Sequence, residues 1–132
     1  MGSVTLAAPP APCSLLTVAE VEQVVGKLKS SPKADQEGNA AWCNYEFASG
    51  KDAMEAWVFP ADGIDRGRKA SKKPVAVKGF GDDAFMDRGM HGINYVNLFV
   101  KKGNVTVQFS IQAPPGDEAK LKALAQKALG RF

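Results

Sequence analysis

The sequence predicts a single α+β domain, a two-layer sandwich whose antiparallel sheet has about five to six strands and carries the N- and C-terminal helices on one face. Three observations favour this fold class. A helix signal comes near the start of the chain, strand patterns joined by short turns follow, and a second helix signal comes at the end. Short connections between neighbouring strands favour antiparallel pairing, because parallel strands need long crossovers.

Composition limits the function classes. The chain has 132 residues, of which 45% are hydrophobic and 23% charged, and its net charge is +3. These proportions are typical of one globular domain. No stretch approaches the roughly 18 apolar residues of a membrane-spanning helix, so we expect no membrane span. The small, scattered positive charge also argues against nucleic acid as a partner.

The first residues predict export. Residues 1–12 read MGSVTLAAPPAP, and we expect them to form a flexible segment before one domain of residues 13–132. Residues 1–3 resemble a remnant of expression, and the small residues and prolines after them resemble the start of a mature exported protein. A native flexible tail is the alternative. Export predicts a periplasmic or secreted location.

The first helix is expected over residues 17–25. Thr17 and Glu20 have the spacing of a capping box, in which each side chain binds the backbone amide of the other residue. Gly26 suits the end of the helix. An apolar stripe at helical spacing would face the core; it comprises Val18, Val21, Val24 and Val25.

Strand patterns fill the middle of the chain. The weakest, near residues 33–37, would be an edge strand. The alternation is clearest over residues 105–111, where apolar and polar side chains would point to opposite faces, one buried and one exposed. The other patterns cover residues 42–47, 54–59, 75–77, 84–87 and 93–101.

Residues 60–73 give no clear pattern. Asp62 is a candidate helix cap, but Gly63 and Gly67 weaken a helix. We interpret the segment as a basic loop or a frayed helix that faces solvent or meets anionic lipid or polysaccharide. Its basic residues are Arg66, Arg68, Lys69, Lys72 and Lys73.

The last helix is expected to begin after Asp117, which can cap it. Lys127 and Arg131 suit the negative end of its dipole. Its core-facing positions are Leu121, Leu124, Ala125 and Ala128.

The two cysteines, Cys13 and Cys43, allow one disulfide. A bridge would close a loop of about 31 residues, which the chain-entropy model values at roughly 3–4 kcal/mol. Two buried free thiols, a redox pair or a lipid-modified Cys13 are alternatives, although no C-x-x-C motif and no lipobox-like segment is present. We favour the disulfide and hence an oxidising compartment.

Three motifs resemble those of small secreted bacterial domains of unknown function that are lipoprotein-like. These are P-C-S-L-L-T at residues 12–17, C-N-Y at 43–45 and G-F-G-D-D-A at 79–84. The resemblance spans most of residues 12–132. It implies an exported envelope or secreted domain with a Cys13–Cys43 bridge and no catalytic activity to transfer. The chain departs from lipoproteins in lacking an evident lipobox.

The Lys78–Asp82 segment also begins like an RNA-recognition signature, but an acid stands where the next aromatic belongs. We interpret it as a structural turn. Gly79 and Gly81 suit positive φ, and Asp82 can accept turn amides.

The resulting functional hypothesis is a non-catalytic binding or interaction module of the bacterial envelope, without a cofactor. Its partner would be an envelope or extracellular protein or a glycan, recognised by polar side chains with aromatic anchors on the exposed sheet face. The candidate surface comprises Trp57, Asn94, Tyr95, Asn97, Thr106 and Gln108.

Two alternatives remain open. Met86, Met90 and His91 could hold Cu(I) as soft ligands of a periplasmic copper carrier. A small hydrolase with an unrecognised site is the other. His91 is the single histidine, and the adjacent acids Asp82 and Asp83 would face opposite sides of a strand.

Overall fold

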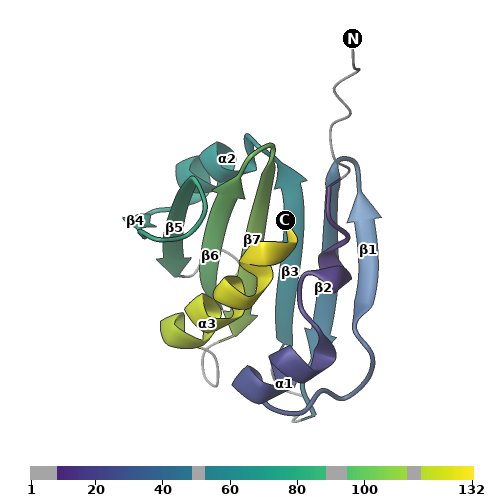
Figure 1. The fold of residues 1–132 in the computed structure, drawn as a ribbon. Helices are drawn as coiled ribbons and strands as arrows, with labels where there is room; N and C mark the ends of the chain where they lie inside the picture. Colours follow the sequence, from purple (N-terminus) through teal and green to yellow (C-terminus); the bar gives the residue numbers. More distant parts are fainter. Residues whose placement is uncertain (1–8, 49–52, 89–94, 113–116) are drawn as a thin grey trace.

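A computed structural model describes residues 9–48, 53–88, 95–112 and 117–132, and in these ranges a single antiparallel sheet of seven strands has the order β1-β2-β3-β7-β6-β5-β4 (Figure 1). The α+β class is confirmed. The helical elements are η1 (Pro12–Ser14), α1 (Val18–Val25), α2 (Gly63–Ala70), α3 (Glu118–Ala128) and η2 (Leu129–Arg131). The strands are β1 (Lys33–Glu37), β2 (Ala40–Glu46), β3 (Ala53–Pro60), β4 (Val75–Ala76), β5 (Asp83–Arg88), β6 (Tyr95–Lys102) and β7 (Val105–Gln112).

The strand count is higher than the expected five to six. The two weakest patterns both pair: β1, exposed along its whole length, with β2, and the two-residue β4 with β5. They form the two edges of the sheet. Edge strands bury little side-chain surface, which is why their sequences alternate poorly.

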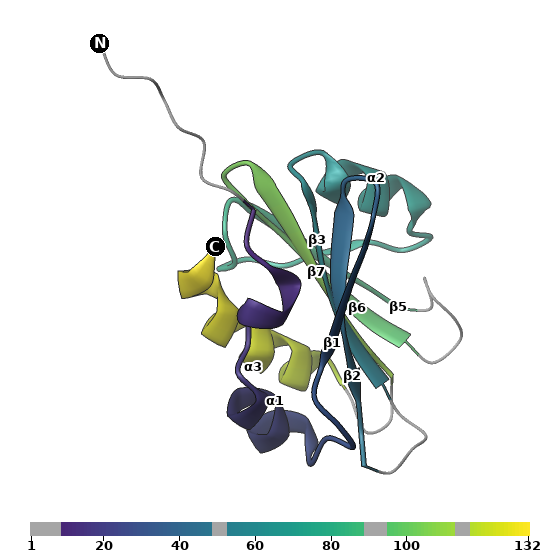
Figure 2. The same ribbon diagram turned by 90° about the vertical axis from the view of Figure 1, so that its right-hand side faces the viewer.

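Helices α1 and α3 lie on the same face of the sheet, as expected (Figure 2). Val21 of α1 and Leu121, Leu124, Ala125 and Ala128 of α3 join one core with the inward side chains of the strands. The capping box at the start of α1 is confirmed. Glu20 N–H donates to the Thr17 hydroxyl at 3.1 Å, and Thr17 N–H donates to the Glu20 carboxylate at 2.9 Å.

The disulfide is confirmed between Cys13 and Cys43, whose Cα atoms lie 5.1 Å apart. Cys13 belongs to η1, and Cys43 lies on β2 with its side chain in the core. The bridge therefore fixes the segment before α1 to the sheet.

Residues 60–73 contain a helix that packs on the opposite face of the sheet. Ile64 of α2 contacts Phe85 and Phe99 in a second apolar cluster. Gly67 allows this approach, because a Cβ there would lie 2.6 Å from Phe99 Cε2. The glycine that weakened the helix signal in the sequence is thus required by its packing.

A strand residue caps α2. The side chain of Asp62 at the N-cap makes no capping bond. Instead the Thr106 hydroxyl accepts from Ile64 N–H at 3.1 Å and donates to the Ala61 carbonyl at 3.0 Å.

The Gly79–Asp82 segment is a turn, as expected, with φ of 89° at Gly79 and 56° at Gly81. The Asp82 carboxylate accepts from Gly103 N–H at 2.8 Å, and Asp82 N–H donates to the Lys101 carbonyl at 2.8 Å. Asp82 therefore binds an amide of the β6–β7 turn and attaches the start of β5 to that hairpin.

The C-terminus is tied to α1 by an ion pair. Arg131 donates to both carboxylate oxygens of Glu20 and to the Leu15 carbonyl at 2.9 Å. The hydrogen bond from Arg131, followed by that from the Thr17 amide, lowers the pKa of Glu20 from 4.5 to about 2.

Because the pKa of Glu20 is lower in the folded state, its contribution is present at neutral pH and is lost as pH falls from about 4.5 to about 2. We expect Glu20→Gln to lower the free energy of unfolding at pH 7. Its difference from wild type should shrink as the pH falls to 2. Urea unfolding across this range measures the effect, with the exposed Glu37→Gln as control. A pH-independent difference would contradict the assignment.

Candidate functional site

The binding surface predicted from sequence is buried at its centre. Asn97 and Thr106 are 0% exposed and Gln108 is 2% exposed, so the expectation that they face solvent is wrong. Trp57 and Tyr95 are half-buried, and Asn94 lies outside the described residues.

These polar side chains bind each other rather than solvent. Ser110 Oγ donates to Asn97 Oδ1 at 2.5 Å, and Gln108 Nε2 donates to Ser110 Oγ at 2.9 Å. Thr106 caps α2. The alternation of apolar and polar residues correctly assigned these polar side chains to the sheet face away from α1 and α3. It does not indicate whether that face is exposed or buried. Whether the rest of the predicted surface binds a partner stays a prediction.

An aromatic row lies beside this network, and sequence reasoning found only one of its members. Trp42 stacks on Trp57 with ring centroids 4.5 Å apart, and Trp57 stacks on Phe59 at 5.6 Å. Trp42 and Trp57 are cross-strand neighbours in β2 and β3. Since the rings cover one another, the row stabilises the strand pairing.

The copper and hydrolase hypotheses stay predictions. Met86 is buried against the core, and Met90 and His91 lie outside the described residues. No group of three or more His, Cys, Asp or Glu side chains suited to a metal ion occurs in the described ranges. Burial raises the pKa of Tyr45 to about 12, so its hydroxyl stays protonated and is a poor base.

The basic segment divides into two parts. On α2, Arg66 pairs with Asp62 at 2.8 Å, and Arg68 donates to both oxygens of Asp83 at 2.8 and 2.9 Å. Lys72 and Lys73 follow the helix and instead line a groove.

This groove, which we call the basic groove, lies between the β4–β5 edge of the sheet and the first turns of α3, and has a volume of about 820 Å³. In Figure 1, β4 marks this edge of the sheet, and the N-terminal end of α3 lies at the same side of the molecule. The lining residues are Lys72, Lys73, Val75, Ala76, Val77, Lys78, Phe80, Met86, Asp87, Arg88, Glu118 and Lys122.

Cations predominate among the described residues that line the basic groove, of which five are basic and two are acidic. Glu118 accepts from Arg88 at 3.0 Å, and Asp87 accepts from Ser71. Within the described ranges, no ion pair engages the four lysines at the groove: Lys72, Lys73, Lys78 and Lys122. The groove therefore holds several positive charges that no described acidic side chain neutralises in an ion pair.

The floor of the basic groove is apolar. Val75 pairs with Met86 across β4 and β5, so both side chains lie on the face that carries α3. Val75 is 62% exposed, whereas Met86 and Phe80 are 5% and 7% exposed. An apolar floor with a few charged groups around it is the usual composition of a small-molecule site.

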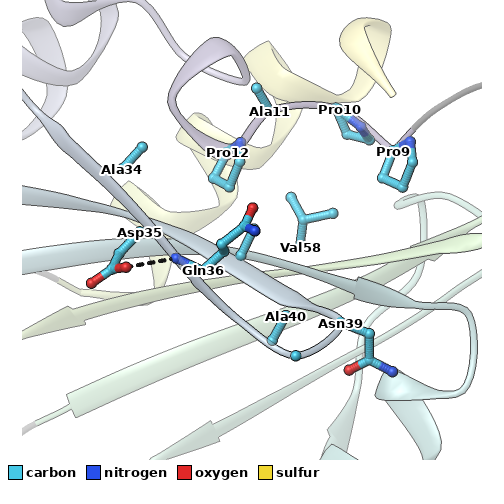
Figure 3. Close-up of a pocket in the computed structure, with 12 residues that line it drawn as sticks. Pro9, Pro10, Ala11, Pro12, Ala34, Asp35, Gln36, Asn39, Ala40 and Val58 are labelled. Atoms are coloured by element: carbon cyan, nitrogen blue, oxygen red, sulfur yellow. Dashed lines mark hydrogen bonds between the residues drawn. The ribbon is translucent and has the colours of Figure 1, made fainter.

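A second hollow of about 600 Å³ lies at the other edge of the sheet, between residues 9–12 and the β1–β2 hairpin (Figure 3). Its walls include Pro9, Pro12 and Val58. Among its described lining residues, Asp35 carries the one charge, and its carboxylate already accepts from the Gln36 amide at 2.8 Å. This hollow therefore offers fewer charged groups for binding a ligand than the basic groove does.

Comparison with protein-family models, with curated proteins and with solved structures gives no match to this chain. The basic groove is therefore interpreted from its own chemistry. Among the described helices, none is long and apolar enough to cross a membrane.

Proposed function

We propose that this protein is a non-catalytic binding module of the bacterial envelope or the extracellular space, and that it holds an anionic ligand in the basic groove. The observation that carries the proposal is the set of four lysines around a concave site, none of which pairs with a described acidic side chain. The Cys13–Cys43 disulfide supports an oxidising compartment, because such bridges rarely persist in the cytosol.

The charges at the groove are suited to binding an anion without strict geometry. Lysine ammonium groups are compact point charges on flexible stems, whereas arginine imposes a planar, bidentate arrangement. Among the described lining residues, Arg88 is the one arginine, and its guanidinium already forms an ion pair with Glu118. Carboxylate and phosphate ligands both meet this requirement.

The proposal predicts that decyl phosphate binds the protein below its micelle concentration and that binding depends on the lysines. A lysine near an anionic lipid surface contributes about 1 kcal/mol, and we expect the same order of magnitude for a lysine beside one phosphate group. We therefore expect the triple variant Lys72→Gln, Lys73→Gln, Lys78→Gln to weaken binding at least tenfold. Isothermal titration calorimetry gives the affinity, and amide chemical shifts locate the site.

The matched control is the triple variant Lys27→Gln, Lys29→Gln, Lys33→Gln, which removes the same charge from exposed positions away from the groove. It should retain wild-type affinity within about twofold. Equal loss in both variants would indicate attraction to net charge alone and would overturn the proposal. Binding of decyltrimethylammonium as tight as that of decyl phosphate would also overturn it.

A further inference from the structure

We propose that the ligand of the basic groove is a single-chain anionic amphiphile, with its acidic group among the lysines and its hydrocarbon chain on the apolar floor. This inference rests on the proposed function and adds the class of ligand.

The first argument is the position of Val75. Within the described ranges, Val18 and Val75 are the two exposed large hydrophobic side chains. Val18 lies on α1, but Val75 lies in the groove between cations, on the same face as Met86. A purely polar anion would leave this apolar surface in water, whereas a hydrocarbon chain would cover it and gain its transfer free energy.

The second argument is that the positively charged side chains and the apolar side chains of the groove lie next to each other. Lys72, Lys73 and Lys78 flank the apolar residues of β4 on one wall, and Lys122 comes from α3 on the other. A ligand whose acidic group meets these lysines can therefore extend its chain directly over Val75 and Val77. Glycan acids lack such a chain, so the floor discriminates against them.

The third argument is shape. A groove of about 820 Å³ falls in the range of small-molecule sites, about 300–1,000 Å³. Phe80 and Met86 form the recessed part of its floor and are less than a tenth exposed. A flat bilayer surface could contact the lysines but could not enter this recess. The recess therefore favours a single amphiphile molecule, bound outside a bilayer, over a membrane surface.

The decisive experiment is a chain-length series of inorganic phosphate, butyl, octyl and decyl phosphate, each below its micelle concentration. A fully buried methylene is worth about 0.8 kcal/mol, a fourfold change in affinity. We expect about a twofold to fourfold gain per methylene. Val75→Thr should weaken decyl phosphate about threefold and leave inorganic phosphate unchanged, and Val18→Thr should change neither.

The outcomes separate this inference from the proposed function. Equal affinity across the series, with the lysine dependence intact, would overturn the amphiphile and leave an anion site. Binding to anionic vesicles without binding to monomeric decyl phosphate would show a membrane-docking surface and would also overturn it. Absence of lysine-dependent binding throughout would overturn both.

Discussion

Replacing Gly81 by alanine is expected to lower the free energy of unfolding by about 3–4 kcal/mol, through left-handed strain and overpacking. The φ of Gly81 is 56°, a conformation that L residues adopt at a cost of about 1–2 kcal/mol. A Cβ there would also lie 2.4 Å from the Lys101 carbonyl oxygen and 3.0 Å from Val100 Cγ1. Because Lys101 and Val100 belong to β6, relieving the contact would disturb the sheet.

Gly38→Ala is the matched control for this variant. Gly38 has a φ of 61°, but a Cβ there would meet nothing within 4 Å. We expect Gly38→Ala to lower the free energy of unfolding only by the cost of the left-handed backbone, about 1–2 kcal/mol. Urea unfolding of both variants measures the difference, and equal losses would contradict the close approach of residue 81 to β6.

Removing the Cys13–Cys43 bridge by the double variant Cys13→Ala, Cys43→Ala is expected to lower the free energy of unfolding by about 3–4 kcal/mol. The bridge limits the freedom of the unfolded chain and holds η1 on β2. A domain of this size has a total stability of about 5–15 kcal/mol, so the variant should unfold at markedly lower urea concentration.

The control for the disulfide is the reductant itself. Dithiothreitol should destabilise the wild-type protein by a similar amount and should leave the double alanine variant unchanged. Detection of two free thiols in the native protein, before any reduction, would contradict the bridge.

Local sequence signals predicted much of the fold. The capping box of Thr17 and Glu20 placed the start of α1, and the alternation over 105–111 placed β7. Such signals succeed because capping bonds and strand periodicity involve residues close in the sequence. The cysteine pair succeeded for a different reason: with two cysteines, only one pairing exists.

Prediction was weakest where a distant element decides the environment. Thr106 and Gln108 were correctly assigned to the polar face of β7. The sequence gives no sign that this face is buried and that Asn97 and Ser110 form a hydrogen bond there. Gly63 and Gly67 argued against a helix by propensity. They are in fact tolerated because α2 packs closely on Phe59 and Phe99.

The sequence by itself determined the α+β class, the first and last helices with strands between them, the cysteine pair and the excess of positive charge. Only the tertiary structure decided which basic residues remain unpaired and what surrounds them. Arg68 forms an ion pair with Asp83, which lies 15 residues further along the chain. In contrast, Lys72, Lys73 and Lys78 line the same apolar groove as Lys122 of α3. The physical reason is that electrostatics and solvent access depend on distances in space, which for these residues are set by the packing of α3 beside the β4–β5 edge.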